Sequence, residues 1–302
     1  MNRYFLCSVA AAALIVAGCE TLDTISNVTT SAAVATGVIN KDQADSINRT
    51  TSAVGKTFDT ITPEQEYWVG RTVAATILAT FKPYDSEAAN HYLNVVGQYL
   101  ALCSDRPETF GGYHFQIMDS DEINAFAAPG GLILVSRGLL RCCPDEEAVA
   151  GVLAHEIGHV ELKHGLKSID KSRMTGALTT VLSEAGKNLG GKELAEATKA
   201  FEGSITDITS TMINSGYSRS FEFQADAAAV HILKNAGYDP NGLVVMLSEM
   251  EKRLKPGGTD FAKTHPDPRV RIDKVKAEIG TIPAVAPSSA RQARFAKALR
   301  GV

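Results

Sequence analysis

The 302-residue sequence predicts a mainly helical α+β domain with one small β-sheet. Helix-start residues and apolar spacings of three and four recur along the chain. Strand-forming residues are concentrated only in residues 113–135, where Pro129, Gly130 and Gly131 interrupt them. A composition of 44% hydrophobic and 21% charged residues is that of an ordinary globular protein, long enough for one large or two small domains.

The charge and the cysteine content exclude two classes of protein. A formal net charge of -4 and a pI near 6.0 argue against a nucleic-acid binder, which needs a basic face to displace counterions from phosphates. Five cysteines in so long a chain do not make a disulfide scaffold, because that class is small and cysteine-dense.

The N-terminus predicts export and a lipid anchor. Arg3 precedes an uncharged, apolar run over residues 4–16, which is too short for a membrane span of about 20 residues and is typical of a secretory signal. The sequence Val-Ala-Gly-Cys at residues 16–19 resembles a bacterial lipobox, so residues 1–18 are expected to be removed and Cys19 lipidated. An ordinary signal peptide cut nearby and an uncleaved anchor helix are the alternatives.

The elements follow in order. Residues 19–60 are rich in Ser, Thr and Ala and predict an arm, within which apolar spacing indicates one helix over residues 44–61. Thr62 and Pro63 start a helix that runs to about residue 81. The other expected elements are a helix over 86–102, strands over 113–118 and 125–135, helices over 218–236, 241–254 and 267–279, and a tail over 281–302 that ends in a short basic helix.

A further helix begins at Pro144, followed by acids that complement the helix dipole, and continues through the motif His-Glu-Ile-Gly-His at residues 155–159. Positions i and i+4 differ by roughly 40° around a helix, so His155 and His159 can reach one Zn²⁺. Glu156 then points beside the metal, where it can accept a proton from a water molecule that the metal acidifies.

A third ligand is needed, and the sequence offers two candidate positions for it. His164 lies nine residues after His155, about 180° around a continuous helix, so it is expected to face away from the metal. Glu222 and Asp226 lie at i and i+4 on another helix, where Glu222 can complete the ligand set and Asp226 can accept a hydrogen bond from a ligating histidine. The alternative for this pair is an exposed acidic helix face.

Several ordered motifs together resemble metallopeptidase family forty-eight, which includes the HtpX-like peptidases, the CAAX prenyl proteases and the mitochondrial Oma-type peptidases. The resemblance covers roughly residues 62–279. Besides His-Glu-Ile-Gly-His-Val from residue 155, the motifs are Arg-Ser-Phe-Glu-Phe-Gln-Ala-Asp from residue 219, Thr-His-Pro from residue 264 with Arg271 six residues after the histidine, Asn-Ala-Phe-Ala-Ala-Pro-Gly-Gly from residue 124, and Gly-Tyr-Asp-Pro from residue 237.

The resemblance implies a gluzincin-type domain over residues 61–280 that holds one Zn²⁺ through His155, His159 and Glu222. It implies that Glu156 activates water and that His265 and Arg271 stabilise the oxyanion. From the residues alone, His265 is as well explained as a helix-start residue and Arg271 as a surface cation. A further hypothesis is that His265 occupies the open zinc position and makes the enzyme latent.

The family also implies that the strand of Asn124, Ala125, Phe126 and Ala127 pairs with an extended substrate at a sheet edge. Pro129 cannot donate in that ladder and is expected to end it. A structural role for Asn124 stays open.

In an exported chain, Cys103 is expected to pair with Cys142 or Cys143, which leaves one thiol over. The predicted protein is therefore a zinc endopeptidase for misfolded envelope proteins or peptides, lipid-anchored at the periplasmic face, with the outer membrane favoured over the inner. An envelope assembly complex is a candidate partner, and nucleic acid is not. The alternatives are a lipoprotein chaperone or assembly factor with a structural or latent zinc site, and a sheath or adhesion lipoprotein without bound metal.

Overall fold

The computed structural model describes residues 61–168, 202–203, 205–253, 268–281 and 288–302. Contacts divide the chain into a unit that ends at Thr62 and a unit from Pro63 to Val302. Only the second unit is described below. The expected signal sequence, the arm with its helix over 44–61, and most of the stretch between residues 168 and 205 lie outside the described residues.

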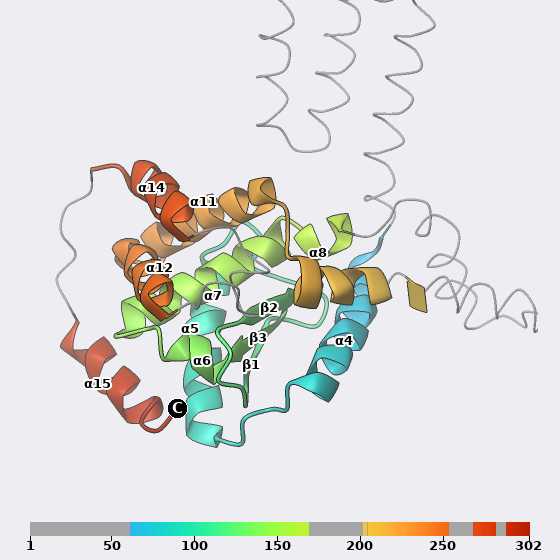
Figure 1. Cartoon of the computed structure of the whole chain (residues 1–302), viewed down its shortest axis with the longest axis horizontal. Coiled ribbons are helices and arrows are strands. Elements are labelled where there is room, and N and C mark those ends of the chain that lie inside the picture. The colour runs from blue at the N-terminus through green and yellow to red at the C-terminus, as the bar shows by residue number, and fades with distance from the viewer. Residues whose placement is uncertain (1–60, 169–201, 204, 254–267, 282–287) are drawn as a thin grey trace, which may run out of the picture. The chain divides into compact units, whose positions relative to one another are not determined.

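Two helices lead into the domain where the sequence predicts them. Helix α4 spans Pro63–Thr80, with Pro63 in the first turn, where a missing N–H costs nothing. Helix α5 spans Glu87–Leu102, and the Ser86 side chain caps it by accepting a hydrogen bond from the Ala89 N–H at 3.4 Å. Helix α4 lies beside the small sheet (Figure 1), and α5 packs against its first strand.

The sheet has three strands in the order β1-β3-β2. Strand β1 spans His114–Met118 and pairs in parallel with β3, which spans Leu132–Ser136, whereas β2 spans Ala125–Ala128 and runs antiparallel to β3. Gly130 and Gly131 make the tight β2–β3 turn with φ values of 77° and 97°, which other residues rarely adopt. Among the described strands β2 pairs only with β3, so it is an edge strand.

Helix α7, Glu146–Glu161, forms the centre of the domain. Its N-terminal Asp145 accepts a hydrogen bond from the Ala148 N–H at 2.9 Å, and nearly every residue of the helix is buried. It packs against α5, β2, α11 and α12, and α14 packs on both α11 and α12 (Figure 1). The bounds of these three helices are Arg219–Asn235 for α11, Asn241–Arg253 for α12 and Pro268–Ile279 for α14.

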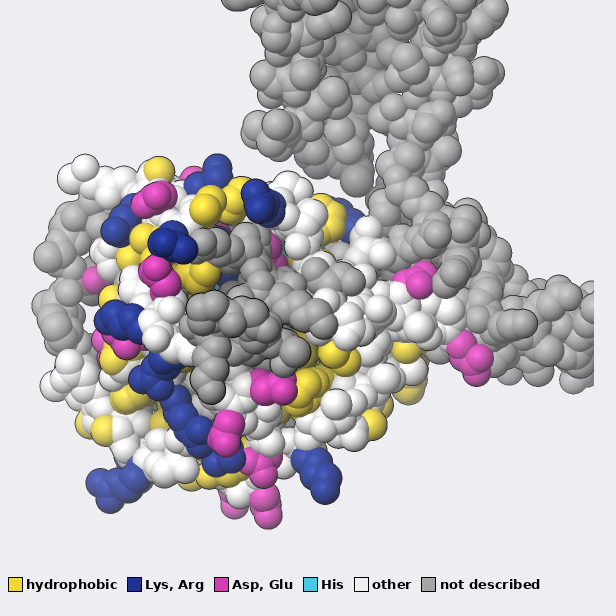
Figure 2. Space-filling view, viewed as in Figure 1, with side chains coloured by type: hydrophobic (Ala, Val, Ile, Leu, Met, Phe, Trp, Pro, Cys, Tyr) yellow, Lys and Arg dark blue, Asp and Glu magenta, His cyan; other side chains and the backbone are white. Residues whose placement is uncertain are grey.

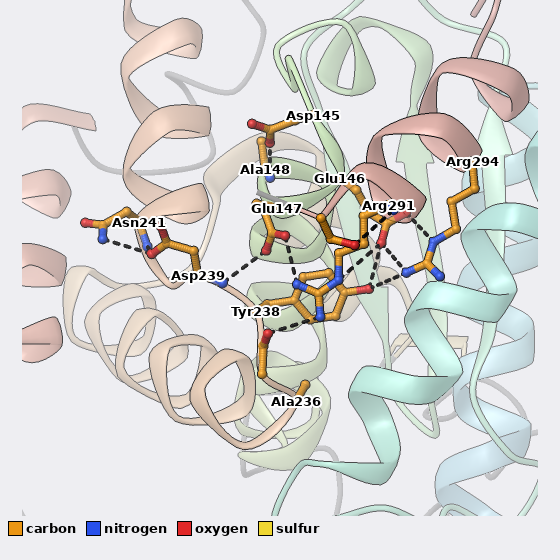
Figure 3. A network of polar contacts seen from close by, with 12 residues as sticks. Asp145, Glu146, Glu147, Ala148, Ala236, Tyr238, Asp239, Asn241, Arg291 and Arg294 are labelled. Carbon is orange, nitrogen blue, oxygen red and sulfur yellow. Dashed lines mark hydrogen bonds and ion pairs between the residues drawn. The ribbon is translucent and has the colours of Figure 1, made fainter. Parts of the chain in front are cut away.

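The short basic helix expected in the tail is α15, Ser289–Ala298, and it packs on α5 and α7. Its Arg294 forms an ion pair with Glu146, whose carboxylate is buried and also accepts hydrogen bonds from the hydroxyls of Tyr92 at 3.2 Å and Tyr238 at 3.0 Å. Figure 3 shows how Arg294 and the neighbouring Arg291 point from α15 toward the first turn of α7. The tail helix is thus tied to the start of the helix that carries the His-Glu-Ile-Gly-His motif.

The predicted class, mainly helical with one small sheet, is confirmed, and the predicted helices that fall within the described residues agree with the observed ones to within a few residues. Short elements add detail: α6 at Arg137–Leu140, α8 at His164–Lys167 and a π-helix η2 at Thr211–Ser215. None of the described helices combines the length and apolarity that a membrane span requires. On the face seen in Figure 2, Lys and Arg side chains are interspersed with Asp and Glu.

The expected disulfide is wrong for this structure, because Cys103, Cys142 and Cys143 are all free thiols. The thiols of Cys142 and Cys143 are buried and face carbonyl oxygens four residues earlier in the chain, those of Gly138 at 3.5 Å and Leu139 at 3.6 Å. Burial raises the pKa of the Cys142 thiol to about 11, so it stays protonated.

Candidate metal centre

Helix α7 places His155 and His159 one turn apart on the same face. Their Nε2 atoms are 3.1 Å apart, and both side chains, together with Glu156, are at least 97% buried. Burying two polar imidazole rings side by side gains little from the hydrophobic effect. Two buried imidazole nitrogens that converge in this way are typical of histidines that bind one metal ion.

Helix α11 supplies the third group. Ser218 caps it by accepting a hydrogen bond from the Phe221 N–H at 3.3 Å, so the helix begins at Arg219 and Glu222 lies in its first turn. The two helices approach closely at Gly158, where an added Cβ would lie 3.0 Å from the Ala225 carbonyl oxygen. This approach brings the buried Glu222 carboxylate within 3.5 Å of both histidine Nε2 atoms.

The donor set fits a divalent cation of zinc type. One ligand atom each from His155, His159 and Glu222 lies within 4.8 Å of the others. Ligands held tetrahedrally at about 2.0–2.1 Å lie roughly 3.3–3.4 Å from one another. The two Nε2 atoms are 3.1 Å apart, Glu222 Oε2 lies 3.5 Å from His155 Nε2, and Glu222 Oε1 lies 3.5 Å from His159 Nε2. These separations are close to that value, and two imidazole nitrogens with a carboxylate are a ligand set that zinc accepts.

The far nitrogen of His155 is held by a buried ion pair. His155 Nδ1 lies 3.0 Å from Asp226 Oδ1, and the carboxylate of Asp226 receives two hydrogen bonds from Arg271, at 2.7 and 2.9 Å. Arg271 is completely buried and its Nη1 also lies 3.5 Å from Glu222. Arg271 Nη2 lies 3.2 Å from Nδ1 and 3.4 Å from Nε2 of the same imidazole. The structure therefore brings Asp226 and Arg271 together against the ring of His155.

The electrostatics of the site favour an added positive charge. Glu156, Glu222 and Asp226 bring three carboxylates against one guanidinium, that of Arg271, which gives a formal charge of -2 in the buried site. Burial opposes the charged form of His155, but the hydrogen bonds to Asp226 and Glu222 outweigh it and raise the pKa of His155 to about 9. Burial raises the pKa of Glu156 to about 7, helped by Glu222. Protons or a divalent cation can supply the missing charge.

Edge strand β2 borders the same site. Ala125, Phe126 and Ala127 line a narrow cleft together with Glu156 and His159. The other lining residues are Met212, Gly216 and Tyr217, from η2 and the loop that follows it.

Asn124 is tied to the sheet instead. Its backbone N–H donates to the Ser136 hydroxyl at 3.0 Å, and its side-chain oxygen accepts from the Ala125 N–H at 3.0 Å. The structure thus brings three of the four expected strand residues to the cleft. Asn124 lies just before β2, at the end of the hairpin away from the turn.

His164 does not face away from the site, as a continuous helix would require. Helix α7 ends at Glu161, and Lys163 adopts a left-handed conformation with φ 54°, which starts the separate helix α8 at His164. The fully buried His164 ring turns back, and its Nδ1 lies 2.9 Å from His159 Nδ1. Burial lowers the pKa of His164 to about 4, which keeps the ring neutral.

Tyr217 is a second neighbour that sequence reasoning missed. Its ring stacks on His159 with centroids 4.6 Å apart and an interplanar angle of 23°. Nothing in the sequence around Lys163 or Tyr217 signals these contacts, since both depend on how distant segments meet. Of the other expected site residues, His265 and the anchor Cys19 lie outside the described residues.

Comparisons with known proteins agree with this geometry. The model of peptidase family M48 matches residues 87–279. The β-barrel assembly-enhancing protease of Escherichia coli (strain K12) is 25% identical over 233 residues, which are 76% of this chain and 46% of the relative. The mitochondrial metalloendopeptidase OMA1 of Schizosaccharomyces pombe is 29% identical over 159 residues, 51% of this chain and 42% of the relative.

The metalloprotease LoiP of Escherichia coli (strain K12) is 24% identical over 198 residues, which cover 66% of this chain and 73% of that protein. The chain spans about half the length of the first relatives it matches. The family match, however, extends over most of the described domain and includes the helices that carry His155, His159 and Glu222. With the buried His/His/Glu cluster built on those helices, the chain belongs to peptidase family M48.

Proposed function

We propose that the protein is a zinc-dependent endopeptidase that cleaves unfolded or misfolded polypeptides in the bacterial cell envelope. The observation that carries this proposal is the cluster of His155, His159 and Glu222, with a buried carboxylate, Glu156, in the same cleft as an edge strand. A structural site would not need a base and an open strand beside it.

Zinc is the metal that the donors favour. Imidazole nitrogens suit zinc, whereas calcium and magnesium prefer sites made of oxygen atoms. His155, His159 and Glu222 would hold the ion through three protein ligands, which is the number that catalytic zinc sites use. Bound there, zinc would polarise the substrate carbonyl and lower the pKa of a water molecule.

The protein's own groups would carry the proton transfers. Glu156, whose pKa is raised to about 7, can take a proton from the attacking water at neutral pH and pass it to the leaving amine nitrogen. Asp226 would fix the ring of His155 by accepting from Nδ1, and Arg271 would hold Asp226 in its ionised form. A direct role for His265 and Arg271 at the oxyanion is part of the proposal, as is latency through His265.

The edge strand supports a preference for extended chains. Ala125, Phe126 and Ala127 lie along the cleft, and a substrate strand could add to edge strand β2 there. Folded proteins rarely expose such a strand, so unfolded segments are the expected substrates.

The envelope location rests on the sequence and on the relatives. One relative is named for enhancing β-barrel assembly, and an envelope assembly complex is accordingly a candidate partner. Lipidation of Cys19 would anchor the body at the periplasmic face of a membrane, and we favour the outer membrane.

The test compares two variants with the unchanged protein, using zinc content and cleavage of unfolded casein with and without a chelator. Glu156→Gln should keep about one zinc per chain and lose cleavage by a factor on the order of 100 or more, because the base is gone. Glu222→Ala should lose the metal as well. Glu161→Gln, near the end of the same helix, is the matched control and should cleave normally.

Cleavage by Glu156→Gln at the unchanged rate would refute the assignment of the base. Tight binding of zinc with no cleavage of any unfolded substrate would instead favour the alternative function, a chaperone or assembly factor with a structural zinc site.

A further inference from the structure

A chain of polar contacts leads from His159, which we propose as a metal ligand, to Gln224 on α11. His159 Nδ1 lies 2.9 Å from His164 Nδ1, and His164 Nε2 lies 3.1 Å from the side-chain oxygen of Gln224. All three groups are neutral or can be neutral, in contrast to the charged pair of Asp226 and Arg271 that holds His155.

The proton positions in this chain are coupled. Two Nδ1 atoms at 2.9 Å require that one donates and the other accepts. If the Gln224 oxygen accepts from His164 Nε2–H, then His164 Nδ1 must accept from His159, which leaves the Nε2 lone pair of His159 for a metal. If the Gln224 amide were reversed and donated, every proton would shift, and His159 would carry its proton on Nε2. Only the first arrangement is compatible with metal binding.

The rings around the chain hold it in place. Phe221 stacks on His164 with centroids 4.3 Å apart and an angle of 6°, and Tyr217 stacks on His159. His164 is fully buried, with a polar partner at each nitrogen. The ring of His164 is therefore held in one orientation and cannot easily flip to exchange its hydrogen-bond partners.

We propose that His164 and Gln224 are positioning residues that select the metal-binding tautomer of His159. The Gln224 oxygen fixes the proton of His164 on Nε2, and His164 Nδ1 in turn fixes the proton of His159 on Nδ1. This inference rests on the proposed zinc function, but it makes statements about proton positions that can be read without any catalysis.

The test uses the full chain and two readouts: the zinc dissociation constant, and ring ¹⁵N chemical shifts of His159 and His164 by NMR in the metal-free and zinc-loaded protein. His164→Phe keeps a ring against Phe221 and removes the acceptor, so zinc should bind about 10–100-fold more weakly. His164→Asn can place an amide oxygen where Nδ1 lies and should restore most of the affinity.

Gln224 offers a matched pair. Gln224→Glu keeps an acceptor and should retain the Nε2–H tautomer of His164, whereas Gln224→Met has a similar size without an acceptor and should give a mixture of tautomers in the metal-free protein. Zinc binding should weaken only for Gln224→Met.

The proposal is overturned if His164 carries its proton on Nδ1 in the zinc-loaded protein, or if His164→Phe binds zinc as tightly as the unchanged chain. These results are separable from failure of the proposed function. A protein that binds zinc with the predicted tautomers and cleaves nothing would refute the peptidase activity. It would still support the proposed roles of His164 and Gln224.

Discussion

Gly158 controls how close α11 comes to α7, and Gly158→Ala tests whether the ligand geometry depends on that approach. An alanine Cβ would lie 3.0 Å from the Ala225 carbonyl oxygen and 3.1 Å from the Ala228 Cβ. Carbon atoms pack best at about 3.5–4.0 Å, so α11 would have to retreat by roughly 0.3–0.5 Å. Glu222, in the first turn of α11, would move with it.

The expected effects on stability and on metal binding differ. Alanine gains up to about 1 kcal/mol over glycine inside a helix, while overpacking costs about 1–3 kcal/mol, so the net loss of unfolding free energy should be roughly 0–2 kcal/mol. Metal sites tolerate only about 0.2 Å of error in ligand distance. We therefore expect zinc to bind about tenfold more weakly, a loss of about 1.4 kcal/mol.

Urea unfolding of the metal-free protein and zinc titration against a competing chelator separate the two effects. Gly151→Ala is the control, because its Cβ would lie 2.8 Å from the Leu243 Cα on α12. That variant should lose more stability than Gly158→Ala and less zinc affinity. If Gly158→Ala bound zinc as tightly as the unchanged protein, the argument that this contact sets the position of Glu222 would be refuted.

Three further predictions concern pH and buried charges. If Glu156 is the base, cleavage needs its carboxylate form, whose pKa is raised to about 7, so kcat/KM should fall as the pH drops. A bound zinc ion would lower this pKa and place the acidic limb at or below about pH 7, and a kcat/KM that rose as the pH fell from about 8 to about 5 would contradict the role of the base. Arg294→Met removes the ion pair to the buried Glu146 and leaves its carboxylate with tyrosine hydroxyls and with Arg291 at 3.9 Å. This change should lower the free energy of unfolding, measured in urea, by about 2–3 kcal/mol, whereas an unchanged midpoint would show that α15 does not stabilise α7. Glu66→Ala removes the buried ion-pair partner of Arg106 and the acceptor of the Gly130 N–H in the turn after β2. The free energy of unfolding, measured by thermal unfolding, should fall by about 3 kcal/mol, and a loss below about 1 kcal/mol would mean that this ion pair contributes little.

Local signals in the sequence predicted the elements well because each start has a physical marker. Pro63 marks the start of α4, and Pro144 with the acids after it marks that of α7, where the structure shows Asp145 as the cap. Gly130 and Gly131 mark the turn between β2 and β3. The spacing of His155 and His159 depends only on helix geometry, so their convergence could be predicted as well.

Contacts between distant segments could not be predicted in the same way. Helix α7 ends because Lys163 adopts a left-handed conformation, a position where glycine or asparagine would have been the recognisable signal. The position of His164 follows from that turn. The free thiols had the same cause, since nothing in the sequence shows that Cys142 and Cys143 face carbonyl groups of their own turn.

The two histidines proposed as metal ligands are held by chemically different partners, and the charge of the site gives a reason. His155 rests against the carboxylate of Asp226, whereas His159 rests against the imidazole of His164. With Asp226, Glu156 and Glu222 ionised beside one guanidinium, a divalent cation brings the buried site to neutrality. A carboxylate in place of His164 would leave one negative charge too many. A site with that extra negative charge would bind the metal more tightly, but the metal would then lower the pKa of the attacking water less. A neutral partner for His159 therefore favours reactivity over affinity.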